Sequence, residues 1–339
     1  MDKITIQTMT TTKTADIAAT VAQIKHMESI GCDIIRVAVP DIESANAIAK
    51  IKENITIPLV ADIHFDHKLA LRSVEAGANA IRINPGNIGP PDGVKAIAKA
   101  CNEKNIPIRI GVNSGSLDKD LLDKYNGPTP EAMVESALRH IEILNKYDFD
   151  NIWLSAKSSN VTKTVKTYRL LHQQTKYPLH LGVTEAGTEY NGIIKSSIAI
   201  GALLLDGIGD TIRVSLTAPP EKEIEAAKAM LTALGLRPGI DIISCPTCGR
   251  CNIDVIAITN EVEKRLALTP TATPSQKLTV AIMGCAVNGP GEASQADYGI
   301  AGGTQEGIIF AKGKIIGKAP MDRLVDELLL QVMATDNCS

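Results

Sequence analysis

Short apolar runs alternate with amphipathic segments from the amino-terminus to about residue 218. The runs have the length of strands, and the segments between them repeat apolar residues at helical spacing. The eight predicted strands are Ile4–Thr8, Ile34–Val39, Leu59–Ile63, Ala80–Ile83, Ile108–Val112, Ile152–Ser155, Leu179–Val183 and Thr211–Ser215. Eight strands, each followed by a helix, predict an α/β fold of the (β/α)8 TIM-barrel type. An open doubly wound sheet is the alternative, but no Gly-x-Gly-x-x-Gly follows the first strand.

The predicted helices of this region repeat apolar positions at a period near 3.6. They include Ile17–Ile30, Asp66–Ala76, Gly93–Asn102, Pro130–Tyr147, Lys163–Thr175, Gly192–Leu205 and Glu221–Leu234. Beyond them Arg237-Pro238-Gly239 indicates a turn. We therefore expect a barrel over residues 1–238 and a second domain over residues 239–339.

The second domain has the pattern of a small α+β fold. It contains a predicted helix, a strand, a hairpin-like pair of strands and a closing helix, at Val255–Leu266, Leu278–Met283, Tyr298–Ala301 with Gly307–Ala311, and Met321–Met333.

An Ile-Arg-(Ile/Val) triplet recurs in four of the predicted barrel strands, centred on Arg36, Arg82, Arg109 and Arg213. Successive side chains of a strand face opposite sides, so each Arg faces away from its apolar neighbours. If those neighbours meet the helices, the four arginines converge inside the barrel and make a pocket for phosphate or carboxylate. The alternative is that inward acids, such as Asp62 and Asp210, neutralise them.

Composition narrows the class of protein. The 339 residues contain 35 Lys+Arg and 38 Asp+Glu, a formal net charge of −3, and only 3% are aromatic. Near-neutral charge and few aromatic side chains argue against nucleic acid as a partner. No apolar run is long enough to span a membrane. The first residues, MDKITIQTMTTTKT, resemble neither a signal peptide nor a transit peptide, so we expect a cytoplasmic protein.

Four of the seven cysteines, Cys245, Cys248, Cys251 and Cys285, lie in one stretch of the second domain. A Cys-x2-Cys-x2-Cys run with a further Cys in a Gly-rich loop indicates a metal site. Spacing alone leaves three interpretations open: an iron–sulfur cluster, a structural zinc, or a redox dithiol of Cys245 and Cys248. With zinc, the chain is a stapled barrel that binds a phosphorylated metabolite without redox chemistry, or a zinc-dependent aldolase or hydrolase.

Longer stretches resemble the 4-hydroxy-3-methylbut-2-en-1-yl diphosphate synthase family, the iron–sulfur reductases of the methylerythritol phosphate route to isoprenoids. The resemblance lies in residues 244–250 with 284–292 of the second domain, and in residues 60–65, 81–87, 109–116, 181–187 and 207–215 of the barrel. It covers almost the whole chain. The chain has no counterpart of the extra middle domain of longer members, so it resembles the short two-domain bacterial form.

The resemblance implies a barrel joined to a reductase-like domain that carries a [4Fe-4S] cluster. The family's ligand set of three Cys and one Glu corresponds to Cys245, Cys248, Cys285 and Glu292. Cys251, a nearby fourth thiol, departs from the family's pattern.

The family's substrate is 2-C-methyl-D-erythritol 2,4-cyclodiphosphate, whose ring is opened with loss of water and uptake of two electrons. The resemblance implies ferredoxin or flavodoxin as the electron donor. It also implies a homodimer in which the barrel of one subunit meets the cluster domain of its partner.

These implications give the predicted site residues their roles. The four arginines and Lys157 bind the diphosphate, and neutral donors assist them at Asn87, Asn113, Ser155 and Ser215. Asp62, His64 and Asp210 orient the arginines or the substrate hydroxyls. Glu185 is the expected proton donor, and Glu292 is the ligand expected to give way to substrate. His180, just inside a strand, is expected to be structural.

Overall fold

The structure, a computed structural model, describes residues 3–84, 86–267, 276–285, 291 and 293–334. The chain divides into two compact units, Met1–Met230 and Leu231–Ser339. The first contains the predicted barrel, and the second contains a mixed sheet with helices. No described helix has the length and apolar character needed to cross a membrane.

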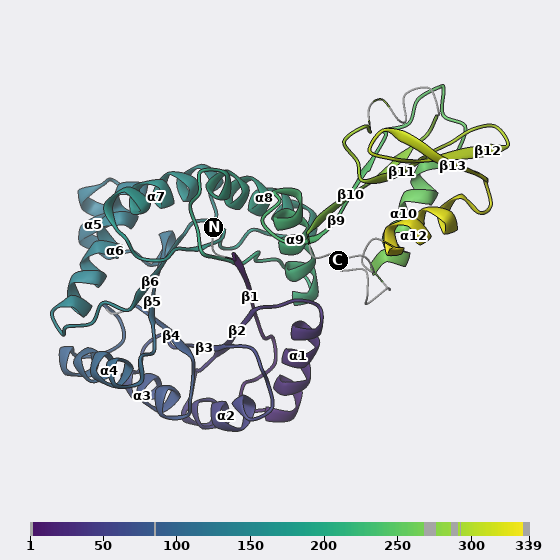
Figure 1. Ribbon diagram of the computed structural model, residues 1–339. Helices are drawn as coiled ribbons and strands as arrows, with labels where there is room; N and C mark the ends of the chain where they lie inside the picture. The colour runs from purple at the N-terminus through teal and green to yellow at the C-terminus, as the bar shows by residue number, and fades with distance from the viewer. Residues whose placement is uncertain (1–2, 85, 268–275, 286–290, 292, 335–339) are drawn as a thin grey trace. The chain divides into compact units, whose positions relative to one another are not determined.

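The first unit is a ring of parallel strands surrounded by helices (Figure 1). The strands follow the order β6-β5-β4-β3-β2-β1-β8-β7, and a bridge between Leu154 and Leu179 joins the two ends of this series. The predicted TIM barrel is therefore confirmed, and the open doubly wound alternative is wrong. The strands are β1 (Thr5–Met9), β2 (Ile34–Ala38), β3 (Leu59–Asp62), β4 (Ala80–Ile83), β5 (Ile108–Asn113), β6 (Ile152–Lys157), β7 (His180–Leu181) and β8 (Thr211–Ile212).

Five helices of the first unit begin at side chains that accept backbone N–H groups. Asp16, Asp41, Asp66, Thr129 and Asn160 cap α1, α2, α3, α6 and α7 in this way. The helices are α1 (Ile17–Ser29), α2 (Ile42–Lys52), α3 (His67–Glu75), α4 (Pro91–Lys104), α5 (Lys119–Lys124), α6 (Pro130–Asn145), α7 (Val161–Gln174), α8 (Glu189–Leu205) and α9 (Pro220–Ala233).

The alternation of the strands determines what fills the ring. Ile35 and Val37 are fully buried on either side of Arg36, and the other arginine triplets follow the same pattern. Arg109 of β5 donates a hydrogen bond to Gln7 of β1, which is distant in the strand order. The arginines therefore point into the barrel, as the alternation predicted.

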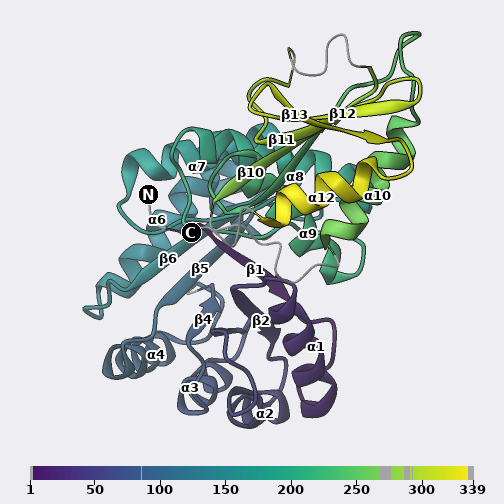
Figure 2. The same cartoon turned by 45° about the vertical axis from the view of Figure 1, so that its right-hand side comes forward.

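The second unit is a five-stranded sheet in the order β13-β12-β11-β10-β9. The pairs from β9 to β11 are parallel, and those from β11 to β13 are antiparallel. Helices α10 and α12 lie side by side against this sheet (Figure 2). The elements are β9 (Gly239–Ser244), α10 (Val255–Ala267), β10 (Lys277–Met283), β11 (Tyr298–Ala301), β12 (Glu306–Ala311), β13 (Lys314–Pro320) and α12 (Leu324–Ala334).

The predicted hairpin of the second unit is confirmed by the antiparallel pairing of β11 with β12. The sequence pattern did not predict β9 or β13. Both are edge strands with largely half-buried or exposed side chains, so neither has a continuous apolar run.

Candidate active site

Asp62, the last residue of β3, lies between two of the barrel arginines. Its Oδ1 accepts a hydrogen bond from Arg82 Nη1 at 3.2 Å, and its Oδ2 lies 3.6 Å from Arg36 Nε. Burial raises the pKa of the Asp62 carboxyl, but the nearby Arg36 and Arg82 guanidinium groups bring it below its ordinary value. Gly111 of β5 leaves room for Arg82, because a Cβ there would overlap the guanidinium. Asp62 is thus an ionised group that orients two cations.

Glu223 of α9 is a second buried acid, and it holds the backbone around β8. Its carboxylate accepts hydrogen bonds from Thr8 Oγ1 at 2.6 Å, Arg213 Nε at 3.3 Å and Leu216 N at 3.0 Å. No sequence signal distinguishes this residue from an acid in the first turn of a surface helix. The sequence alone therefore did not identify Glu223 as a site residue.

Met9, the last residue of β1, contacts two of the arginines through its sulfur. Arg36 Nε and Nη2 lie 3.2 and 3.1 Å from Met9 Sδ, and Arg213 Nη1 lies 3.9 Å from it. A thioether is a weak acceptor. These N–H groups can therefore exchange the sulfur for an anionic oxygen with a gain in free energy.

Arg109 is the arginine with the fewest partners. Its side chain is almost fully buried, and its Nη1 donates to Gln7 Oε1 at 2.7 Å. Within the described residues its Nε and Nη2 have no hydrogen-bond partner. Burial lowers the pKa of Arg109 to about 10, against the attraction of Asp62. An N–H edge of this kind binds a carboxylate or phosphate with two parallel hydrogen bonds.

Lys157, the last residue of β6, is a buried cation that makes no ion pair with any described residue. Burial, followed by repulsion from Arg36 and Arg213, lowers its pKa well below the ordinary value of a lysine. Gly182 leaves space for the ammonium group, because a Cβ there would lie 2.8 Å from Lys157 Nζ.

Together these groups carry more positive than negative charge. Two carboxylates, those of Asp62 and Glu223, face five cationic side chains, which we call the barrel cations: Arg36, Arg82, Arg109, Lys157 and Arg213. The alternative, in which internal acids neutralise every arginine, holds only in part. Buried like charges repel one another, so the arrangement favours the entry of an anion with several charges.

The predicted neutral donors lie on, or shortly after, strands that carry or directly precede barrel cations. Ser155 of β6 is buried, and Asn113 and Ser215 are half-buried near the carboxyl ends of β5 and β8. His180 of β7 is fully buried and shares a hydrogen bond with Thr211 Oγ1. Burial and repulsion from Lys157 lower the pKa of His180 well below its ordinary value, so its ring is neutral. His180, which the sequence analysis expects to be structural, is buried within the electrostatic field of the barrel cations.

Four predicted site residues stand apart from this group. His64 is mostly exposed, with its Nε2 3.8 Å from Asp62 Oδ1. Asn87 and Glu185 are exposed in the loops after β4 and β7, and Glu185 has a left-handed backbone with φ 52°. Asp210 precedes β8, and its carboxylate accepts the N–H of Leu179 at 2.7 Å. Asp210 therefore pairs segments at the amino-terminal end of the strands, and the structure does not bring it to the arginines.

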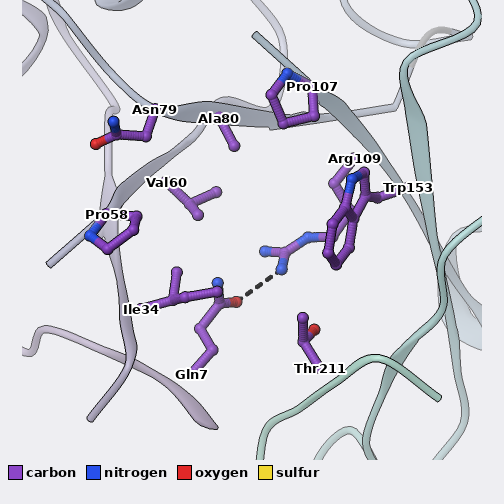
Figure 3. A pocket seen from close by; sticks show the side chains of 10 residues that line it. All are labelled: Gln7, Ile34, Pro58, Val60, Asn79, Ala80, Pro107, Arg109, Trp153 and Thr211. Atoms are coloured by element: carbon purple, nitrogen blue, oxygen red, sulfur yellow. Dashed lines mark hydrogen bonds between the residues drawn. The ribbon is translucent and has the colours of Figure 1, made fainter. Parts of the chain in front are cut away.

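A cavity of about 140 Å³ lies at that amino-terminal end of the barrel (Figure 3). Its lining is mostly apolar and comes from strand starts and the residues before them. The Arg109 guanidinium extends among these side chains and bonds to Gln7, with Trp153 beside it. The lining residues are Gln7, Ile34, Pro58, Val60, Asn79, Ala80, Pro107, Arg109, Trp153 and Thr211.

In the second unit, the cysteines follow two neighbouring parallel strands. Cys245 comes directly after β9 and Cys285 soon after β10, so both lie at the carboxyl edge of the sheet. The Gly284 N–H donates to Cys245 Sγ at 3.1 Å. Gly284 also makes space for sulfur, because a Cβ there would overlap Cys251 Sγ and lie 3.2 Å from Cys245 Sγ. Cys248 is exposed.

This donor set suits a thiolate-bound iron–sulfur cluster, because soft sulfur ligands favour iron–sulfur clusters and each thiolate can bind a different iron. In the described part of the chain, no three His, Cys, Asp or Glu side chains are close enough together to hold a single metal ion. The predicted ligand Glu292 lies outside the described residues.

These features define a class of protein, a TIM barrel with an anion pocket followed by a cysteine-bearing domain. A family model described as the GcpE TIM-barrel domain matches residues 1–228, and one described as the GcpE protein C-terminal domain matches residues 241–334. The chain belongs to the GcpE family.

Curated relatives support this assignment over nearly their whole length. A protein of Caldicellulosiruptor saccharolyticus is 59% identical over 331 residues, which cover 98% of this chain and 94% of the relative. A Clostridium perfringens protein is 58% identical, with 96% and 93% covered, and a Bacillus pumilus protein is 53% identical, with 98% and 88% covered. All three are named 4-hydroxy-3-methylbut-2-en-1-yl diphosphate synthase (flavodoxin). The family resemblance of the sequence is confirmed, the chain is an oxidoreductase, and the zinc-stapled alternative is not favoured.

Proposed function

We propose that the chain reduces 2-C-methyl-D-erythritol 2,4-cyclodiphosphate to 4-hydroxy-3-methylbut-2-en-1-yl diphosphate. One carbon–oxygen bond to phosphate opens, one oxygen leaves as water, and two electrons and two protons enter. Residues 1–238 bind the substrate, and residues 239–339 hold a [4Fe-4S] cluster. The observation that carries the proposal is the excess of buried cations over carboxylates inside the barrel.

The barrel cations bind the two phosphate groups. The Nε–H and Nη2–H groups of Arg109 and the Lys157 ammonium donate to phosphate oxygens, and among the described residues they lose no ion pair by doing so. Arg36 and Arg213 exchange the Met9 sulfur for phosphate. Each charge-assisted hydrogen bond contributes about 1.5–3 kcal/mol. Arg82 stays with Asp62 and adds its remaining N–H groups.

Neutral side chains orient the sugar-alcohol part of the substrate. Ser155, Asn113 and Ser215 lie on, or shortly after, strands that carry or directly precede barrel cations, and they can donate to hydroxyl or phosphate oxygens. Asn87 and His64, in loops that follow β4 and β3, contribute at the rim.

Glu185 supplies the proton to the leaving oxygen. Asp62 is unsuited to this role, because its pKa is held below the ordinary value and its carboxylate already orients Arg36 and Arg82. Glu185 is exposed in the loop after β7, at the end of the barrel where catalytic side chains are usual. Its left-handed backbone is a conformation that non-glycine residues adopt at a cost in free energy, and such strain is common at functional sites.

Cys245, Cys248 and Cys285, with Glu292, are the proposed ligands of the cluster. When bound, the cluster supplies single electrons and a Lewis-acidic iron. Flavodoxin or ferredoxin supplies the electrons to the cluster. The enzyme acts in the cytoplasm as a homodimer in which each barrel uses the cluster domain of its partner. An enzyme that sediments as a monomer with full activity would refute the dimer.

The test is an anaerobic preparation assayed with the cyclic diphosphate and chemically reduced flavodoxin. We expect brown protein with about four irons and four sulfides per chain. We also expect the open-chain allylic diphosphate as the product, identified by mass spectrometry. A colourless protein with one zinc, which binds the cyclic diphosphate without converting it, would overturn the proposal.

A further inference from the structure

Two half-buried thiols, those of Cys245 and Cys251, lie against the same point of the second unit. A Cβ placed on Gly284 would overlap Cys251 Sγ and lie 3.2 Å from Cys245 Sγ. Two sulfurs this near to one point are within reach of each other. Gly284 is therefore a glycine whose missing side chain leaves the space between two sulfurs open.

The backbone brings the two ends of the intervening loop together. Cys245 N donates to Ile282 O at 3.1 Å, and Asn252 N donates to Gly284 O at 2.9 Å. Both ends of the segment from Cys245 to Asn252 are therefore held against residues 282–284, which keeps the two cysteines near each other.

The two sulfurs also differ in their hydrogen bonds. Cys245 Sγ accepts the Gly284 N–H at 3.1 Å. Cys251 Sγ donates to Ile253 O at 3.2 Å. These contacts hold both sulfurs beside Gly284, where thiol–disulfide exchange can join them.

We propose that Cys245 and Cys251 form a reversible disulfide when the chain is without its cluster. The oxidant is a low-molecular-weight disulfide such as oxidised glutathione. One protein sulfur attacks it and releases one glutathione, and the second protein sulfur then displaces the other. A sulfur–sulfur bond forms within the protein, two thiol hydrogens pass to the two glutathione molecules, and the two electrons lost by the cysteines reduce the glutathione disulfide.

The disulfide gives a role to Cys251, which is not among the proposed cluster ligands. It withdraws Cys245 from cluster binding until a thiol reductant returns it, and it protects that sulfur from irreversible oxidation. This consequence rests on the proposed function, whereas the disulfide itself does not.

The test uses the full-length chain, stripped of metal and treated with oxidised glutathione. Trypsin cleaves after Arg250, between Cys248 and Cys251, so the disulfide links two peptides, residues 229–250 and 251–264. We expect the chain to lose two of its seven thiols and to give this linked pair, which separates on reduction. A bond from Cys245 to Cys248 stays within residues 229–250, so the two outcomes differ by mass.

Two variants provide the controls. Cys251→Ser removes the linked pair of peptides, whereas Cys248→Ser keeps it. The proposal is overturned by a disulfide within residues 229–250 of the wild type, by a link to the peptide that contains Cys285, or by no loss of thiols. Failure of the proposed function has a different signature: a reduced chain that regains all its thiols and then binds no iron and sulfide on anaerobic reconstitution.

Discussion

The barrel and the cysteine loops hold their functional groups in opposite ways. In the barrel, Asp62, Glu223 and Gln7 position the cations through hydrogen bonds between different strands and helices. In the second unit, the cysteines lie on loops after β9 and β10, and Cys248 is exposed. The barrel is thus organised in advance for an anion, whereas the cysteines lie on loops beyond the strand ends.

The two sites also differ in the source of their binding energy. The barrel cations repel one another, and this repulsion lowers the pKa of Arg36 and Lys157 beyond the effect of burial. An anion relieves that repulsion. The cysteine site instead depends on bonds between sulfur and metal, so it is coupled to metal and to oxidation state.

The largest expected effect is the loss of the cluster without a loss of anion binding in the barrel. Cys245→Ser should abolish the iron–sulfur absorbance and all turnover, because a proposed cluster ligand, the sulfur that accepts the Gly284 N–H, is lost. Binding of inorganic pyrophosphate should stay within about twofold of the wild type, since the barrel cations are untouched. Trp153, the single tryptophan, lies beside Arg109 and reports binding by its fluorescence. Loss of pyrophosphate binding would contradict the independence of the two sites.

Removal of the shared acid should destabilise the empty barrel. Asp62→Asn leaves Arg36 and Arg82 without their charge partner, and loss of one member of a buried ion pair costs about 3–5 kcal/mol. Chemical denaturation should show this loss, and pyrophosphate should restore more stability to the variant than to the wild type. The exposed pair Arg169–Asp206 supplies the control, since Asp206→Asn should change stability by less than about 1 kcal/mol.

Arg109→Met should weaken the substrate complex by about 100-fold, since roughly 3 kcal/mol of bidentate binding is lost. The expected change is in the dissociation constant of the cyclic diphosphate, measured by calorimetry, with the iron content unaltered. Arg169→Met, an exposed change on α7, should leave the constant unaltered. Equal constants for wild type and Arg109→Met would remove Arg109 from the substrate site.

The smallest expected effect is the uptake of a proton by Lys157 when an anion binds. Because burial and repulsion lower the pKa of Lys157, a fraction of this residue is neutral in the empty barrel at alkaline pH. A bound anion raises the pKa again, so binding takes up protons and weakens as the pH rises through the lowered pKa. Calorimetry in two buffers of different ionisation enthalpy, at pH about 8, should detect uptake of up to one proton.

Lys157→Met should remove this proton uptake, whereas Lys99→Met, on the exposed surface of α4, should retain it. Unchanged uptake in Lys157→Met would assign the proton to another group.

Much of the barrel could be predicted because its strands repeat short apolar runs at regular intervals. The arginines could be placed inside it because side chains alternate across a strand. Asp62 was also expected as a partner of the arginines, and it pairs with Arg36 and Arg82, but their other partners could not be predicted. The bond from Arg109 to Gln7 spans 102 residues, and Glu223 reaches Arg213 from a helix outside the ring. Asp210 was expected near the arginines, but its carboxylate, directly before β8, accepts the N–H of Leu179 instead.

The sequence by itself therefore determined the apolar periods of the strands and helices, the spacing of the cysteines and the family. Each of these can be read from residues that are close together along the chain. Folding alone settled which charges stay unpaired and which sulfurs meet at Gly284. The unpaired charges and the meeting of the sulfurs both result from ring closure and strand pairing, which bring together segments that are distant in the sequence. The free energy of a buried charge depends on its neighbours in space, so the sequence pattern alone cannot give it.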